Sequence, residues 1–180
     1  MKRILILGPG GAGKSTLARK LAAKLDLPLI HLDQHYWQPD WVPMDPEKWP
    51  AVIAELTARD SWVMDGNYAS ALDQRLEVAD VAVFLDFNRW KSLWGAFTRV
   101  LKQSGQVRSD MAPGCPEQFD GEFFIWLWNF PRDSKPELEA AFARHPQTQV
   151  VRLRSRNAVG KWLGALSACP KRFQDGSMDT

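Results

Sequence analysis

The residues from Gly8 to Thr16 constrain this chain more than any other stretch, because they read G-P-G-G-A-G-K-S-T. They fit the phosphate-loop pattern G-x-x-x-x-G-K-[ST] without a mismatch. Glycines let a backbone curl so that successive N–H groups point inward at an anion. The Lys14 ammonium can reach terminal phosphates, and the Ser15 hydroxyl can ligate Mg²⁺. We therefore expect nucleotide phosphates at Gly8, Gly10, Gly11, Ala12, Gly13, Lys14, Ser15 and Thr16.

The sequence on either side of the loop supports this prediction. Ile4–Leu7 is a short apolar run, which predicts a buried parallel strand. After the loop, Leu17, Leu21 and Leu25 recur at helical spacing. The N-terminus of that helix would add its partial positive charge beneath the phosphates. The alternative is a plain glycine turn that joins a strand to a helix.

Apolar segments further along the chain predict the rest of the fold. Four of them read as strands, at residues 29–32, 62–64, 81–85 and 149–153. Their alternation with helices predicts an α/β domain in which a five-stranded parallel sheet has helices on both faces. Asp33, Asp65 and Asp86 follow three of the strands, so we expect them at the sheet edge where ligands bind in such folds. Each could instead cap a helix or a turn.

The length and composition of the chain limit the number of domains and the kinds of partner that we expect. Its 180 residues suit a single domain, expected over residues 1–170 and followed by a polar tail at 171–180. The 23 basic and 21 acidic residues leave a net charge of +2, which gives no general argument for binding nucleic acid. The apolar run at the amino terminus is too short for a signal peptide, and no longer run predicts a membrane span. We expect a cytoplasmic protein with reduced thiols at Cys115 and Cys169.

Nine tryptophans are unusual in a chain of this length. Several lie at helical spacing, on a helix expected from about residue 90 to near residues 104–105 and on an apolar helix expected at 122–130. Core packing is the prediction for Trp90, Trp94, Trp126, Trp128 and Trp162. Trp37 and Trp41 lie in segment 34–60, whose start is too rich in proline for regular structure. We expect this segment beside the molecule that accepts a phosphoryl group, where the two tryptophans would line its pocket, stack on a base or join the core.

Together these residues resemble the adenylate-kinase-like P-loop kinases over about residues 1–165. The closest branch in this resemblance is that of the topology modulation proteins. The segments that carry it are His31-Leu32-Asp33, Trp62-Val63-Met64-Asp65-Gly66-Asn67-Tyr68, Arg75, Leu85-Asp86, Arg108-Ser109-Asp110 and Cys115-Pro116-Glu117. The resemblance implies the P-loop NTPase fold, and the Gly- and Pro-rich residues 104–121 would form its lid.

The resemblance also implies roles for individual residues. Asp65 would hold Mg²⁺ together with Ser15, and Asp33 would orient or deprotonate the acceptor hydroxyl. Arg99 and Arg108 would close over the transferred phosphoryl group. Arg99 could also be a solvated charge on a helix, and position 102 carries a lysine where such lids often have an arginine.

The remaining candidates surround the base and the acceptor. Arg156 would lie against the nucleotide base. The acceptor would meet Asp33, Trp37, Trp41, Asn67, Tyr68 and Arg75. Of these, Arg75 would hold an acceptor phosphate or be a plain surface residue.

The sequence therefore predicts an enzyme that transfers the γ-phosphoryl group of Mg-ATP to a small acceptor, in the first place a nucleotide or nucleoside. The alternative is a nucleotide-dependent regulator or ATPase that acts on DNA topology or on a protein partner. A nucleotide-binding protein without turnover is a third possibility. The even charge balance and the lack of a recognisable DNA-binding helix pair argue against nucleic acid as a partner. ATP and GTP are both compatible with these residues, and the oligomeric state stays open.

Overall fold

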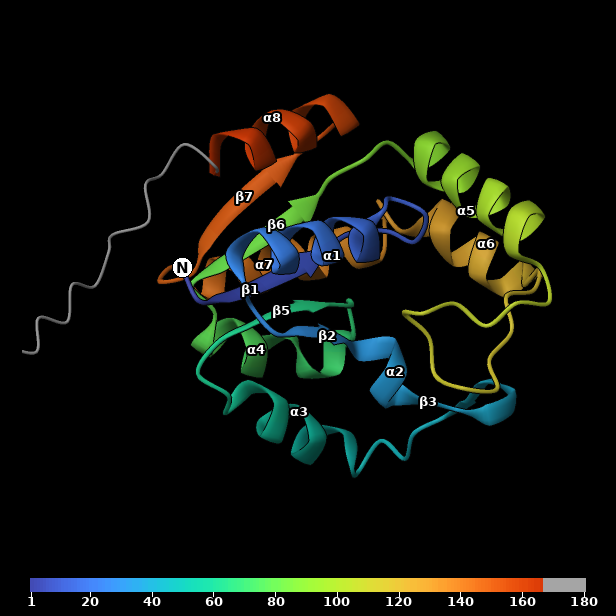
Figure 1. Ribbon diagram of the computed structural model, residues 1–180, viewed down its shortest axis with the longest axis horizontal. Helices are drawn as coiled ribbons and strands as arrows, with labels where there is room; N and C mark the ends of the chain where they lie inside the picture. Colours follow the sequence, from blue (N-terminus) through green and yellow to red (C-terminus); the bar gives the residue numbers. More distant parts are fainter. Residues whose placement is uncertain (167–180) are drawn as a thin grey trace, which may run out of the picture.

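Five parallel strands form one sheet at the centre of the computed structural model, which describes residues 1–166 (Figure 1). The order across the sheet is β2-β5-β1-β6-β7. The strands are β1 (Arg3–Leu7), β2 (Leu29–His31), β5 (Trp62–Asp65), β6 (Val81–Leu85) and β7 (Gln149–Leu153). Ile4 of the central strand β1 pairs with Val63 of β5 and with Val81 of β6. The predicted α/β fold with a five-stranded parallel sheet is confirmed.

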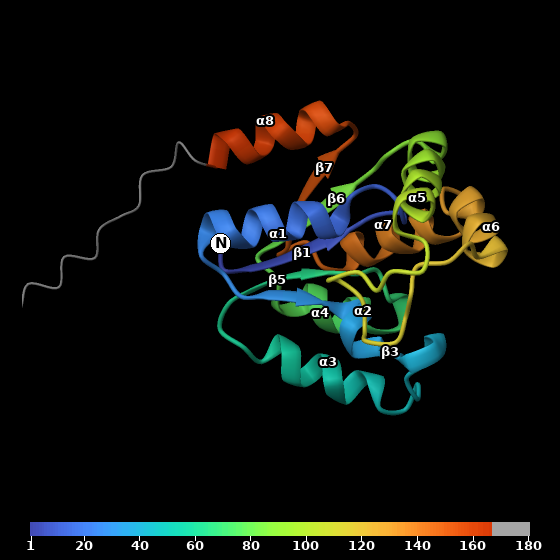
Figure 2. The same ribbon diagram turned by 45° about the vertical axis from the view of Figure 1, so that its right-hand side comes forward.

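Helices cover both faces of the sheet, because the side chains of β1 alternate between two hydrophobic cores. Ile4 and Ile6 point to a face that two helices cover, α1 (Lys14–Leu25) and α8 (Arg156–Leu166). Leu5 and Leu7 point to a face that three helices cover, α3 (Trp49–Thr57), α4 (Leu72–Val78) and α7 (Ser134–Arg144). Figure 2 shows the sheet between these two layers.

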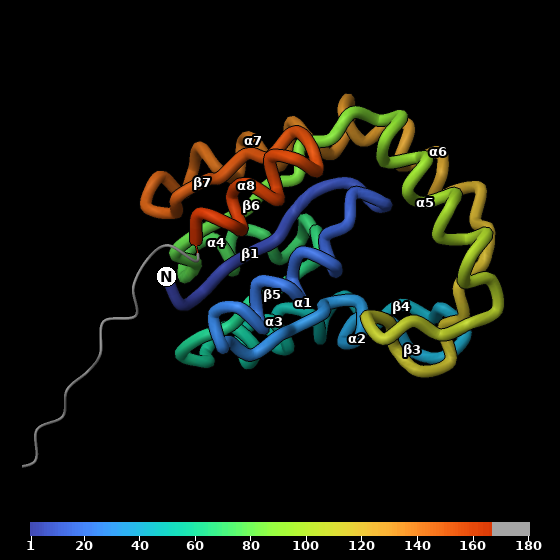
Figure 3. The backbone as a smooth tube through the Cα atoms, turned by 45° about the horizontal axis from the view of Figure 1, so that its top comes forward, coloured from blue at the N-terminus to red at the C-terminus, as the bar shows by residue number. Residues whose placement is uncertain are grey.

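Two further helices lie side by side beyond the carboxyl ends of the strands, α5 (Arg89–Gln103) and α6 (Gly121–Asn129) (Figure 3). The chain between them, residues 104–120, forms two isolated β-bridges, Ser104 with Glu117 and Val107 with Pro116. This segment contains no helix, so the expected long loop is present, and we call it the lid loop.

The segment after β2 differs from the prediction. A strand over residues 29–32 and irregular chain after it were expected, but β2 ends at His31 and a short helix, α2 (Leu32–Tyr36), follows. The reason is that β2 is an edge strand whose neighbour β5 ends opposite His31, so later residues have no partner strand. A small antiparallel pair then forms between β3 (Trp37–Gln38) and β4 (Val42–Pro43), around a 3₁₀ turn at Pro39–Trp41.

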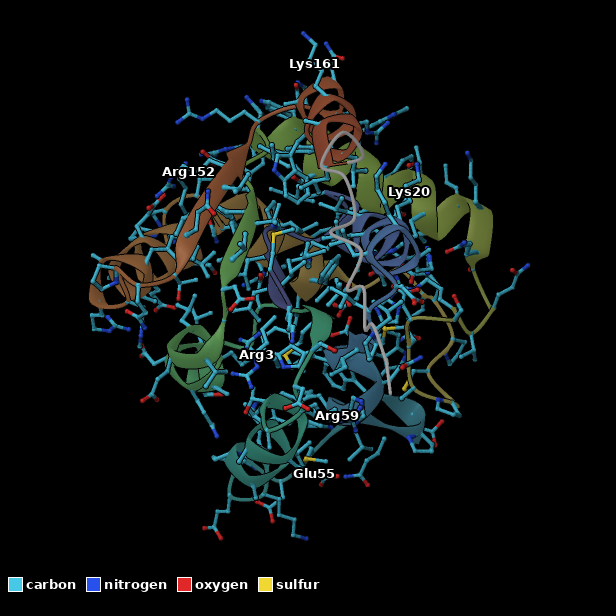
Figure 4. All side chains as sticks on the ribbon, turned by 60° about the vertical axis from the view of Figure 1, so that its left-hand side comes forward. Arg3, Lys20, Glu55, Arg59, Arg152 and Lys161 are labelled. Carbon is cyan, nitrogen blue, oxygen red and sulfur yellow. The ribbon has the colours of Figure 1, made fainter. Side chains whose placement is uncertain are left out.

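Charged side chains lie on the outer faces of the helices, as the exposed Lys20 on α1 and Lys161 on α8 illustrate (Figure 4). A helix long and apolar enough to cross a membrane is not found within residues 1–166. Cys115 is a buried free thiol. Cys169 and the predicted polar tail at 171–180 lie outside the described residues.

Candidate active site

The phosphate loop connects β1 to α1 and has the conformation that its sequence predicts. Gly11 and Gly13 have φ angles of 71° and 91°, which residues with a Cβ rarely adopt. Gly13 is the N-cap of α1, so the unpaired N–H groups at the start of this helix lie next to the loop. Lys14 Nζ donates a hydrogen bond to the Pro9 carbonyl oxygen at 3.2 Å. This contact holds the lysine over its own loop.

Helix α5 packs directly against the phosphate loop through Gly95. A Cβ atom on Gly95 would lie 2.2 Å from the Gly11 carbonyl oxygen, and one on Gly11 would lie 2.2 Å from the Ser92 carbonyl oxygen. Only glycine fits at both positions. Because Arg99 follows Gly95 by four residues, this contact places its side chain on the same face of α5 as the loop.

A cavity of about 820 Å³ opens beside the phosphate loop. Its size is in the range of small-molecule sites. Most of the predicted site residues line it, namely Gly10, Gly11, Gly13, Lys14, Ser15, Thr16, Asp33, Trp37, Trp41, Asp65, Asn67, Tyr68, Arg99, Arg108 and Arg156. Three predicted residues do not belong to its lining, Gly8, Ala12 and Arg75. The fold thus brings together residues that lie far apart in the sequence.

The carboxylate of Asp65 is buried at the end of β5, next to His31. Asp65 Oδ1 and His31 Nδ1 are 2.5 Å apart, and both side chains are almost fully buried. The two residues form the last pair between β2 and β5, so the sheet register brings them together. His31 therefore fixes the orientation of the Asp65 carboxylate.

Asp33 lies in the first turn of α2, where its Oδ1 accepts a hydrogen bond from the Tyr68 hydroxyl at 2.5 Å. Burial raises the pKa of Asp33 above its usual value, while the Tyr68 hydrogen bond and the Lys14 charge lower it. Burial also raises the pKa of Tyr68, so this hydroxyl stays a donor. Burial lowers the pKa of Lys14, and the charges of Asp33 and Asp65 oppose that change. The lysine and both carboxylates therefore interact within one site.

The loop after β5 links the phosphate loop to Asp33. The Asn67 side chain donates to the Gly8 carbonyl oxygen at 2.8 Å and accepts from the Gly8 N–H at 3.0 Å. The next residue is Tyr68, which contacts Asp33. Asn67 therefore reaches the cavity but uses its amide to hold the phosphate loop.

Arg75 of α4 corrects one prediction. Its side chain is 0% exposed, and its guanidinium donates to the carbonyl oxygens of Gly66 at 2.8 Å and Tyr68 at 2.9 Å, and also to that of Asn67. Burial lowers the pKa of Arg75 to about 9. Because its donors are already used inside the protein, Arg75 is neither a surface residue nor an acceptor-phosphate ligand. It holds the loop that carries Asn67 and Tyr68.

Both predicted lid arginines line the cavity, and one carboxylate joins them. Arg99 Nε lies 2.9 Å from Glu117 Oε1, and Arg108 Nε lies 3.0 Å from Glu117 Oε2. Arg108 also lies 3.6 Å from Asp110. Burial and the neighbouring Arg108 charge lower the pKa of Arg99. Arg99 is therefore a paired, largely buried charge, and not a solvated charge on a helix.

Trp37 and Trp41 form an aromatic wall of the cavity. Their ring centroids are 5.5 Å apart. Both pack against a small cluster of the lid loop that contains Met111 and Cys115, and Trp41 Nε1 donates to the Pro116 carbonyl oxygen at 3.1 Å. Their position is compatible with both predicted roles, as pocket wall and as part of a core, because each ring lines the cavity and also packs against this cluster.

The donors beside the phosphate loop fit Mg²⁺. Ser15 and Asp65 both line the cavity and offer oxygen ligands, with Asp33 and Asp110 nearby. Within residues 1–166 no cluster of three or more His, Cys, Asp or Glu side chains could hold a metal ion by itself. Mg²⁺ commonly takes one or two carboxylates and completes its shell with substrate phosphates and water. The residues therefore suit an ion that binds together with a nucleotide.

Asp86 follows β6 at the carboxyl edge of the sheet, as expected, but it does not line the cavity beside the phosphate loop. Its carboxylate lies 2.6 Å from Lys135 Nζ and 3.5 Å from Arg154 Nε. It lines a separate cavity of about 460 Å³. The two cations from α7 and the β7–α8 turn hold the Asp86 side chain away from the phosphate loop.

The core prediction for the helical tryptophans is mostly wrong. Trp90 and Trp94 on α5 are 64% and 65% exposed, and Trp126 and Trp128 on α6 are also exposed. Both helices extend past the sheet, so only one face of each has something to pack on. The expected buried helix at 122–130 accordingly has Leu127 as its one buried residue. Trp162 alone packs against a hydrophobic core as expected.

Sequence reasoning missed three residues of the site as functional candidates. Glu117 and His31 lie within the segments on which the family resemblance rests, so the resemblance could have identified both as site residues. Gly95 stands in the interior of a predicted helix, where glycine is unfavourable and often marks a close packing contact. The pairing of each residue required knowledge of the tertiary structure.

No family model and no curated protein sequence matches the chain. Solved structures are similar to it in fold. A shikimate kinase from Acinetobacter baumannii in complex with shikimate has a TM-score of 0.62 and 17% identity, over 92% of this chain and 90% of that one. A shikimate kinase from Bacteroides thetaiotaomicron has a TM-score of 0.52 and 16% identity, over 92% and 96%. The chain has the P-loop NTPase fold that these kinases share.

Proposed function

We propose that this chain transfers the γ-phosphoryl group of Mg-ATP to a hydroxyl group of a small molecule. The observation that carries the proposal is the single cavity that contains the phosphate loop, the Asp33 carboxylate, Arg99 and Arg108. Phosphoryl transfer depends mostly on positioning and on neutralising charge. These residues supply both, and the similarity in fold to known kinases supports the proposal.

The residues of the cavity have different roles in this reaction. The phosphate loop and Lys14 bind the nucleotide phosphates, and Mg²⁺ on Ser15 and Asp65 supplies further charge neutralisation when bound. Asp33 accepts the proton of the acceptor hydroxyl as that oxygen attacks the γ-phosphorus, and the bond from this phosphorus to the bridging oxygen breaks, so that ADP leaves. Arg99 and Arg108 donate to the transferred phosphoryl oxygens, where negative charge has to be stabilised. Arg156 lies against the nucleotide base.

The acceptor that fits this cavity is a hydroxylated ring compound. Trp37, Trp41 and Tyr68 offer aromatic surface close to the Asp33 carboxylate, and flat aromatic surfaces favour ring-shaped ligands. Nucleosides and nucleotides, predicted from the sequence, have this chemistry. So does shikimate, the ligand of one structurally similar kinase. Both classes belong in the first acceptor panel.

The finer resemblance, to the topology modulation proteins, stays a prediction. It is also the main support for the second function, a regulator or ATPase that acts on DNA topology. The near-neutral net charge of +2 gives that function no electrostatic support. We therefore rank it below phosphoryl transfer to a small molecule.

ADP release by the purified protein tests the proposal, with Mg-ATP and a panel of shikimate, nucleosides, nucleoside monophosphates and simple alcohols. We expect one acceptor to raise turnover strongly and to be recovered phosphorylated. Lys14→Ala should lower kcat/KM at least about 100-fold, because it removes a cation from the phosphate site. Lys20→Ala, on the exposed face of the same helix, is the matched control and should leave activity unchanged. Tight ATP binding without stimulation by any acceptor would contradict the proposal, and supercoiled DNA would be added next.

A further inference from the structure

Seven large apolar side chains are exposed on α5 and α6, and one of them, Trp126, lines the cavity. We call the other six the outer lid surface: Trp90, Trp94, Phe97, Leu101, Ile125 and Trp128. The Trp90 and Trp128 rings meet at 5.1 Å, which makes the exposed side chains of the two helices one continuous surface. The four aromatic side chains alone expose on the order of 400 Å². A patch of this size is among the largest that monomeric proteins expose, and such patches often have a function.

The outer lid surface lies opposite the face of α5 that packs inside the molecule. Its four α5 residues are spaced by four, three and four positions, which places them in one stripe with the spacing that helices use to pack on each other. The other side of α5 carries the buried Ser92 and Ala96, and Gly95 against the phosphate loop. The stripe is covered by nothing else within residues 1–166, so its spacing predicts a helical partner.

Charge indicates which partner fits. Helix α5 carries no acidic residue and exposes Lys91 and Lys102, whereas α6 carries the acidic Glu122 and no basic residue. Glu122 precedes Ile125 by three residues and therefore lies on the same stripe of α6. If α5 of one copy faces α6 of another, opposite charges meet and like charges stay apart.

We propose that two copies of this chain associate through the outer lid surface, with α5 of each copy packed against α6 of its partner. Two antiparallel helix pairs then form a four-helix bundle around a two-fold axis. The aromatic area of the patch is about half of the roughly 800 Å² that each partner buries in a standard interface. Leu101 and Ile125 and the neighbouring polar side chains contribute further area. The proposal does not depend on the proposed activity, because the residues of α5 and α6 that line the cavity are other ones, such as Arg99 and Phe123.

Sedimentation equilibrium of the full chain at micromolar concentrations tests this proposal. The wild type is expected at twice the mass of the chain. Trp94→Asp combined with Leu101→Asp should weaken dimerisation more than about 100-fold, since it places two charges in the centre of an apolar interface. Val42→Asp changes a similarly exposed apolar residue on β4 and should leave the dimer intact. Ile125→Lys tests α6 independently of α5.

Each outcome of these measurements bears on the proposal. A wild type that stays monomeric throughout the concentration range overturns it. A dimer that survives both the α5 and the α6 variants overturns it too, because another surface must then be used. A monomeric wild type that binds vesicles with 30% phosphatidylserine would assign the surface to membranes. Unchanged circular dichroism spectra and melting temperatures of the variants show that loss of the dimer is not loss of folding.

Discussion

Asp33 combines two opposing influences on its charge. Burial raises the pKa of its carboxyl group, and the hydrogen bond from Tyr68 lowers it. A proton acceptor must be ionised, so kcat/KM should fall as the pH drops through the pKa of Asp33. Since the net shift is upward from the usual value of 3.8, this acid limb should lie above pH 3.8.

Tyr68→Phe removes the hydrogen bond and should move the acid limb of kcat/KM to higher pH. A hydrogen bond to a charged group contributes about 1.5–3 kcal/mol, and one pKa unit corresponds to about 1.4 kcal/mol. The expected displacement is therefore about one to two pH units. The measurement is the pH profile of kcat/KM with the acceptor found in the panel. Tyr36→Phe, in contact with the same ring, is the control, and identical profiles for both variants would exclude the assignment of this limb to Asp33.

The carboxylate of Glu117 links helix α5 to the lid loop. Glu117 of the loop is 4% exposed and contacts Arg99 of α5 and Arg108 of the loop itself. Two guanidinium groups so close repel each other, which contributes to the lowered pKa of Arg99. Glu117 offsets this repulsion and positions both arginines at the cavity.

Glu117→Gln keeps the shape of the side chain but removes its charge. We expect kcat to fall about 10- to 100-fold, because the arginines lose the group that holds them. The KM of the acceptor should change much less, since the acceptor binds on the side of Trp37 and Asp33. Steady-state kinetics with both substrates measure this difference. Glu137→Gln on the exposed surface of α7 is the control; an equal loss of kcat there would point to a general charge effect.

Across the whole molecule, a series of hydrogen bonds connects the buried Arg75 to the phosphate loop and to Asp33. Arg75 lies inside the protein and binds the loop after β5. That loop contacts the phosphate loop through Asn67 and Asp33 through Tyr68. The stability of the fold and the geometry of the site therefore depend on the same buried arginine.

Arg75→Met should lower the free energy of unfolding by at least about 3 kcal/mol, because it leaves several buried carbonyl groups without donors. Urea unfolding followed by circular dichroism measures this loss. Arg59→Met removes an exposed arginine after α3 and should change stability by less than about 0.5 kcal/mol. If the two variants were equally stable, the buried hydrogen bonds of Arg75 would not have the importance assigned to them.

The local amino-acid pattern is sufficient to predict those structural elements whose conformation depends on residues close by in the sequence. The glycines and the lysine of the phosphate loop, the apolar strand before it and the helical spacing after it specify one local conformation, and the structure contains it. Strands predicted from short apolar runs likewise appear, because buried parallel strands need such runs. Asp33, Asp65 and Asp86 lie at the predicted edge of the sheet, because parallel topology brings the carboxyl ends of strands to one edge. Only Asp33 and Asp65 line the cavity.

Sequence pattern alone predicts the fold class, the phosphate loop and about half of the residues that line the cavity. Which of these side chains pair depends on the tertiary structure. His31 and Asp65 are 34 residues apart, and Arg99 and Glu117 are 18 apart, so no local spacing encodes their contacts. The tertiary structure also determines that Arg75 is buried and that Trp90 and Trp94 are exposed. Helical periodicity indicates that a helix has an apolar face, but what covers that face depends on where the rest of the chain lies.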